Sequence, residues 1–149
     1  MAVQDFLRKL LFMPTTLRAK ILVLSDTAAA GRRRDESGPA VQELLERHGW
    51  QVSAYSILPD EAEQIRQQLE RWTAGDDCDA IFTTGGTGLG PRDTTPEVTR
   101  ALAEREVAGL AELMRAEGMR RTRRAALASI IDLLPHALDV LQGRSEHPN

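Results

Sequence analysis

The sequence predicts an α/β fold of three layers, in which a mostly parallel sheet is flanked by helices on both faces. Short apolar runs alternate with segments whose apolar residues have helical spacing, as in successive βα units. Ile21–Leu24 is a continuous apolar run, which is typical of a parallel strand covered on both faces. The glycine-rich stretch Gly85–Gly90 then stands between a strand and a helix, the place where parallel sheets bind ligands.

The first strand, Ile21–Leu24, ends at two polar residues, Ser25 and Asp26. Ligands of open α/β sheets gather at the carboxyl ends of strands, so both are candidate ligand-binding residues. Residues 27–36 are predicted to form a loop that contains the run Arg32–Arg34. Such runs are usually solvated surface, and the alternative is a loop of arginines that holds a polyanion beside a phosphate site.

The next segments repeat the pattern. A helix is predicted from Ser37 to Gly49 and a strand from Trp50 to Leu58. A further helix follows, with an apolar stripe of Ala62, Ile65, Leu69 and Trp72. Asp60 stands at its start, and two interpretations stay open: a helix cap, or a ligand residue if Asp60 lies on the same sheet edge as Asp93.

The third strand runs from Ala80 into the glycine stretch, whose N–H groups can converge on an anion. Its spacing matches neither a Walker loop nor a dinucleotide fingerprint, and the simplest alternative is a tight strand-to-helix connection. Thr95 is expected to cap the following helix, with Pro96 in its first turn. The candidate phosphate-binding residues are Gly85, Gly86, Thr87, Gly88 and Arg92.

The remaining chain contains further helical segments. One is predicted to stop at Gly118, and another closes the domain from Pro135 to Gly143. We therefore expect one α/β domain at residues 19–143, a polar tail at 144–149 and an N-terminal extension at 1–18. The extension has the pattern of a short amphipathic helix, or it is a frayed tail.

The composition of the chain narrows the classes of function that it can have. A chain of 149 residues with 42% hydrophobic content suits one domain with its own core. The net charge of −3 argues against a general nucleic-acid binder. Cys78 is the only cysteine, and the three histidines lack metal-ligand spacing. No transmembrane run or signal-cleavage pattern is visible, so we expect a cytoplasmic protein with no membrane partner.

The string Thr83–Gly88, with Arg92-Asp93 and Thr95–Glu97, resembles the signature of a molybdenum cofactor biosynthesis family. This MogA/MoaB family includes the molybdopterin adenylyltransferases, and its domain also occurs in the molybdenum insertases and in gephyrin. The resemblance covers most of the chain. Further matching segments are Ser25-Asp26, Asp35–Pro39, Pro59–Glu61 and Gly109-Leu110 with Met114-Arg115.

The resemblance implies an α/β domain that usually forms trimers and an enzyme that transfers AMP from ATP to the terminal phosphate of molybdopterin. Asp60 and Asp93 would be the catalytic carboxylates and would hold Mg²⁺. Ser25 and Asp26 would line the pocket. The turn Gly85–Gly88 would bind phosphate oxygens together with Arg92.

This sequence departs from the family pattern after Ala125. In the family, a further apolar strand and an Asn-Leu-Pro-Gly-Ser/Asn-Pro turn follow this region. Here Ser129 runs directly into Ile130–His136, so that strand and turn are expected to be deleted. The alternative function is therefore a molybdopterin- or nucleotide-binding homologue without turnover.

Overall fold

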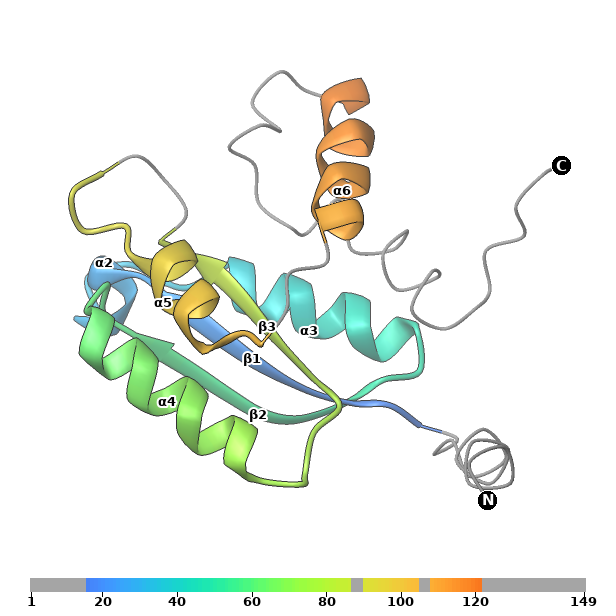
Figure 1. The fold of residues 1–149 in the computed structure, drawn as a ribbon, viewed down its shortest axis with the longest axis horizontal. Coiled ribbons are helices and arrows are strands. Elements are labelled where there is room, and N and C mark those ends of the chain that lie inside the picture. Colours follow the sequence, from blue (N-terminus) through green and yellow to red (C-terminus); the bar gives the residue numbers. More distant parts are fainter. Residues whose placement is uncertain (1–15, 87–89, 105–107, 122–149) are drawn as a thin grey trace, which may run out of the picture.

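The computed structural model describes residues 16–86, 90–104 and 108–121. Each strand in this part of the chain is followed by one or two helices (Figure 1). The strands are β1 (Arg18–Leu24), β2 (Gln51–Leu58) and β3 (Ala80–Gly85). The helices are α2 (Asp26–Ala29), α3 (Ser37–Arg47), α4 (Ala62–Ala74), α5 (Thr95–Leu102) and α6 (Ala108–Arg121).

The three strands form a parallel sheet in the order β2-β1-β3. The register places Leu24 opposite Leu58 of β2 and opposite Gly85 of β3. All three strands therefore end at one edge of the sheet, which we call the carboxyl edge (Figure 1). The loops that follow the three strands begin side by side.

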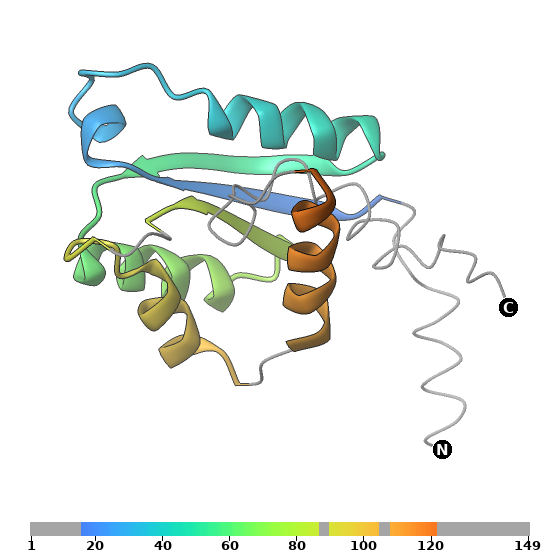
Figure 2. The same cartoon turned by 90° about the horizontal axis from the view of Figure 1, so that it is seen from above.

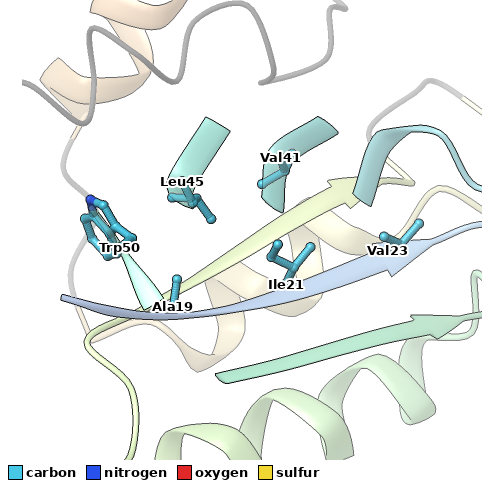
Figure 3. Close-up of a cluster of buried hydrophobic side chains, with 6 residues drawn as sticks. All are labelled: Ala19, Ile21, Val23, Val41, Leu45 and Trp50. Carbon is cyan, nitrogen blue, oxygen red and sulfur yellow. The ribbon is translucent and has the colours of Figure 1, made fainter. Parts of the chain in front are cut away.

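Helices cover both faces of this sheet (Figure 2). Side chains of β1 alternate between the two faces, and each set is buried against helices. On the α3 face, the buried cluster is Ala19, Ile21, Val23, Val41, Leu45 and Trp50 (Figure 3). On the face covered by α4 and α5, it is Leu22, Leu24, Ile65, Leu69 and Trp72. These layers confirm the predicted three-layer α/β fold.

Three local features differ from the sequence prediction. The short helix α2 lies within a predicted loop, where the Ser25 hydroxyl oxygen accepts a hydrogen bond from the Ala28 N–H over 3.3 Å. Ala62, the first residue of α4, is exposed, whereas the later positions of the predicted stripe are buried. Helix α6 continues through Gly118, because a single interior glycine costs a helix only about 1 kcal/mol.

The predicted domain boundaries fall largely outside the described residues. Residues 1–15 and 122–149 are not among them, and neither is the expected deletion near Ser129. Arg18, the last residue of the predicted extension, is the first residue of β1. In the part that the structure describes, no helix is long and apolar enough to cross a membrane.

Charged side chains fasten the opposite, amino edge of the sheet. The Lys20 ammonium lies 2.7 Å from Asp77 Oδ1 and 5.6 Å from the centre of the Trp72 ring, and Lys20 is almost fully buried. Beside it, the Arg18 guanidinium pairs with Asp79 over 3.2 Å. The acidic turn before β3 therefore anchors that strand to β1.

Gly85, the last residue of β3, has a left-handed φ of +91°, and it is packed tightly against β1. A Cβ at this position would lie 2.0 Å from the Leu24 carbonyl oxygen. This contact is with the backbone of the central strand, so rotation of a side chain cannot relieve it. Glycine is therefore required where β3 enters the turn.

Gly85→Ala should lower the free energy of unfolding by about 3 kcal/mol or more, because left-handed strain and a backbone clash add together. Gly49→Ala is the matched control, since Gly49 has a φ of +80° with open space around it. It should cost only about 1 kcal/mol. Urea unfolding measures the free energy of unfolding of both variants. An equal loss of stability in the two would contradict the close packing of Gly85 against Leu24.

Candidate functional site

The carboxyl edge brings together predicted site residues from three separate βα units. Ser25 and Asp26 follow β1, Asp60 follows β2, and Gly86 follows β3. The Ser25 N–H donates to the Leu58 carbonyl over 2.9 Å, which extends the β1–β2 ladder by one bond. The Ser25 hydroxyl is used locally as the cap of α2 and lies 3.2 Å from the Thr27 hydroxyl.

Asp26 and Asp60 hold each other through reciprocal hydrogen bonds. The Asp26 N–H donates to Asp60 Oδ2 over 3.2 Å, and the Asp60 N–H donates to Asp26 Oδ1 over 3.0 Å. Asp60 is not a helix cap, because α4 has Glu61 at its N-cap position. Of the two interpretations left open for Asp60, the capping role is therefore wrong, and its carboxylate faces the carboxyl edge.

Arg92 ties the loop after β3 to the same pair. Its Nε and Nη2 atoms donate to the two carboxylate oxygens of Asp26 over 2.8 Å and 3.1 Å. These hydrogen bonds, with that from the Asp60 backbone, lower the pKa of Asp26. The Arg92 side chain is 59% exposed, and exposed ion pairs contribute little to stability. Arg92 can therefore exchange Asp26 for a phosphate group at small cost.

Asp60 is in a different electrostatic environment. Burial raises the pKa of its carboxyl group, and the negative charges of Asp26 and Asp93 raise it further. Asp60 Oδ1 is buried and has no hydrogen-bond partner in the part of the chain that the structure describes. An ionised carboxylate with a buried, unpaired oxygen is well suited to a cation or to a hydrogen-bond donor from a ligand.

Gly86 lies directly against this carboxylate. It has a left-handed φ of +59°, and a Cβ here would lie 2.8 Å from Asp60 Oδ1 and 2.3 Å from Thr95 Oγ1. Any side chain at this position would therefore displace both oxygens. The third strand thus turns over the edge at two consecutive glycines with left-handed φ values, which brings its backbone against Asp60 and Thr95.

Two threonines belong to this site although the sequence did not single them out as site residues. Thr95 was expected to cap α5, but it is the first residue of that helix, and Thr94 occupies the cap position without a side-chain cap bond. Both hydroxyls are buried and lack partners among the described residues. The sequence offered one hint, which is that two hydroxyl residues stand directly before Pro96, but this pattern alone does not indicate that the hydroxyls are buried.

Asp93 closes the turn that precedes α5. Its Oδ2 atom accepts a hydrogen bond from the Gly90 N–H over 3.1 Å. Its charge acts on Asp60, which places the two predicted catalytic carboxylates in one electrostatic neighbourhood. Thr87 and Gly88, the two other predicted phosphate ligands, lie outside the described residues.

The donor set fits Mg²⁺ only in its substrate-assisted mode. Over residues 16–86, 90–104 and 108–121, no group of three or more Asp, Glu, His or Cys side chains is placed to hold a metal ion. Mg²⁺ is commonly held by one or two carboxylates together with substrate phosphates. The unpaired oxygen of Asp60, with Asp93 nearby, matches that requirement.

Comparison with known proteins identifies the family. The model described as "Probable molybdopterin binding domain" matches residues 20–140. The chain belongs to this molybdopterin-binding domain family. Among curated relatives, molybdenum cofactor biosynthesis protein B of Halalkalibacterium halodurans is 42% identical over 102 residues, which are 68% of this chain and 59% of that protein. The Drosophila melanogaster molybdenum cofactor synthesis protein cinnamon is 38% identical over 109 residues, which are 72% of this chain and 18% of that protein.

Solved structures show the same molybdopterin-binding fold. The molybdopterin biosynthesis enzyme MoaB of Thermus thermophilus is 38% identical, with a TM-score of 0.71 over 86% of this chain and 98% of that one. A molybdopterin biosynthesis protein of Mycobacterium abscessus is 28% identical, with a TM-score of 0.74 over 85% and 94% of the two chains. The chain spans 59% or less of the length of the curated relatives named above.

The electrostatic coupling at the edge can be tested by titration. Asp26→Asn should lower the pKa of Asp60, because it removes a nearby negative charge. Arg92→Gln should raise the pKa of Asp60, because it removes a nearby positive charge. The measurement is an NMR pH titration of the Asp60 carboxyl carbon in each variant. Shifts of the same sign in both variants would contradict the proposed arrangement of charges.

Proposed function

We propose that this chain acts in molybdenum cofactor biosynthesis as a Mg²⁺- and ATP-dependent adenylyltransferase whose acceptor is molybdopterin. The observation that carries the proposal is the buried, unpaired Asp60 oxygen beside Gly86. Both lie at the carboxyl edge together with Asp26, Arg92 and Asp93, and we call these five residues the rim. Membership of the molybdopterin-binding domain family supports the acceptor. The names of the relatives, which refer to molybdenum cofactor or molybdopterin biosynthesis, support the pathway.

The reaction needs no side-chain nucleophile. An oxygen of the molybdopterin terminal phosphate attacks the α-phosphorus of ATP, and the bond from that phosphorus to the bridging oxygen of the β-phosphate breaks. Pyrophosphate leaves with the electron pair of that bond, and AMP is joined to the pterin phosphate. Such a transfer depends on positioning and on compensation of negative charge.

Each rim residue has a role in that task. Asp60 and Asp93 would hold Mg²⁺, which when bound offsets negative charge on the phosphates. Arg92 exchanges Asp26 for a phosphate oxygen, and Asp26 is then left to hold the Asp60 loop. Gly85 and Gly86 carry no Cβ, so the turn can pack against Leu24, Asp60 and Thr95 and hold its backbone N–H groups at the site. A homotrimeric assembly, which the family resemblance implies, also belongs to this proposal.

Asp60→Asn and Asp93→Asn should each reduce pyrophosphate release by about 100-fold or more, because each removes a charge that organises the transferring phosphates. The assay follows pyrophosphate from purified protein supplied with molybdopterin, ATP and Mg²⁺. Asp76→Asn is the matched control, since Asp76 is an exposed carboxylate in the turn before β3, at the amino edge of the sheet. It should leave the rate within about twofold of the wild type, as expected for a surface change.

Three outcomes would count against this proposal. Saturable molybdopterin binding without pyrophosphate release would favour a binding homologue without turnover. Unchanged rates in the Asp60 and Asp93 variants would remove these carboxylates from the mechanism. No binding of molybdopterin by the wild-type protein would reject both the adenylyltransferase and the binding homologue.

A further inference from the structure

Arg32, Arg33 and Arg34 form a run of exposed cations in the loop between α2 and α3. Their side chains make no hydrogen bond or ion pair with any part of the chain that the structure describes. Arginines elsewhere behave differently, because Arg18, Arg66 and Arg92 all pair with carboxylates. The run therefore presents three positive charges with no carboxylate in direct contact, within the part of the chain that the structure describes.

The backbone at the start of this run is fixed to the candidate site. The N–H groups of Arg32 and Arg33 both donate to the Thr27 carbonyl, over 2.9 Å and 3.2 Å. Gly31 makes the bend possible with a left-handed φ of +68°. Thr27 directly follows Asp26, the residue that binds Arg92. The arginines are thus held beside the carboxyl edge.

The end of the run is fixed by Asp35. One of its oxygens accepts hydrogen bonds from the Ser37 N–H over 3.0 Å and from the Ser37 hydroxyl over 2.9 Å. The other accepts from the Gly38 N–H over 3.1 Å and from the Tyr55 hydroxyl. Gly38 is required here, because a Cβ would lie 2.2 Å from the Tyr55 ring. The loop is therefore anchored to both α3 and β2.

This arrangement is an ordered backbone with unpaired charged side chains. Fixing a loop before it binds reduces the conformational entropy that binding would otherwise cost. The charge of Arg32, the first arginine of the run, also helps to lower the pKa of Asp26. Arginine clusters of this kind recognise phosphate groups through paired N–H donors.

We propose that Arg32–Arg34 bind the polyphosphate of the nucleotide, so that the rim holds the reacting phosphate while the arginine loop holds the phosphates beyond it. This inference rests on the nucleotide site of the proposed function. A small polyanion fits better than a nucleic acid, because the whole chain carries a net charge of −3 and the uncompensated cations span one loop. The loop then selects nucleoside triphosphates over monophosphates.

The test replaces Arg32, Arg33 and Arg34 together by glutamine. The control replaces Arg47, Arg66 and Arg71 by glutamine, which removes the same charge from α3 and α4. Calorimetry measures the affinities of the wild type and of both variants for ATP, tripolyphosphate and AMP, with all proteins in the same buffer containing Mg²⁺. The loop variant should bind ATP and tripolyphosphate on the order of 10-fold to 100-fold more weakly and AMP within about twofold of wild type. The control should match wild type.

Several results would overturn the inference. These are equal ATP affinity in the loop and control variants, an equal loss for AMP and ATP, or no binding of ATP and tripolyphosphate by the wild type. Tighter binding of single-stranded RNA than of ATP, lost in the loop variant, would assign the loop to a different ligand. Pyrophosphate release separates the two proposals: an unchanged KM for ATP in the loop variant rejects the arginine role alone. Arginine-dependent ATP binding without release rejects the transferase alone.

Discussion

The candidate site depends on one exchange of hydrogen bonds, in which Asp26 and Asp60 each donate a backbone N–H to the carboxylate of the other. This exchange is possible because parallel pairing ends β1 and β2 at the same level. It forces two like charges close together, which is unfavourable unless one is compensated. Arg92 compensates Asp26, and Asp60 is left with a raised pKa and an unpaired oxygen.

The glycines after β3 bring the third loop to this pair. Gly85 lies against the Leu24 carbonyl and Gly86 against Asp60 and Thr95, so each would clash if it carried a side chain. The turn can lie this close to Leu24 and Asp60 because two consecutive residues adopt left-handed φ values. A turn built from residues with side chains would stand further away from Asp60, and the rim would be open on that side.

The sequence predicted the strands well because β1 is covered on both faces, which requires a continuous apolar run such as Ile21–Leu24. The meeting of Asp26 and Asp60 could be predicted from the topology, because neighbouring parallel strands end at the same edge of the sheet. Local rules failed where tertiary contacts decided the outcome. Asp60 looked like a helix cap, but its carboxylate accepts a hydrogen bond from the N–H of Asp26, which follows β1. The unpaired Thr94 and Thr95 hydroxyls could not be predicted, because burial on α5 depends on packing.

The two edges of the sheet differ in how far their polar side chains are paired. At the amino edge, Lys20 and Arg18 pair with acidic residues, so those charges hold β3 to β1. At the carboxyl edge, buried oxygens of Asp60, Thr94 and Thr95 lack partners among the described residues. Each unpaired buried polar group costs a fold about 1–3 kcal/mol, while a whole domain is stable by only about 5–15 kcal/mol. A domain that concentrates such costs beside a glycine turn would be stabilised by a ligand that supplies the missing partners, so binding at this rim would be coupled to the stability of the fold.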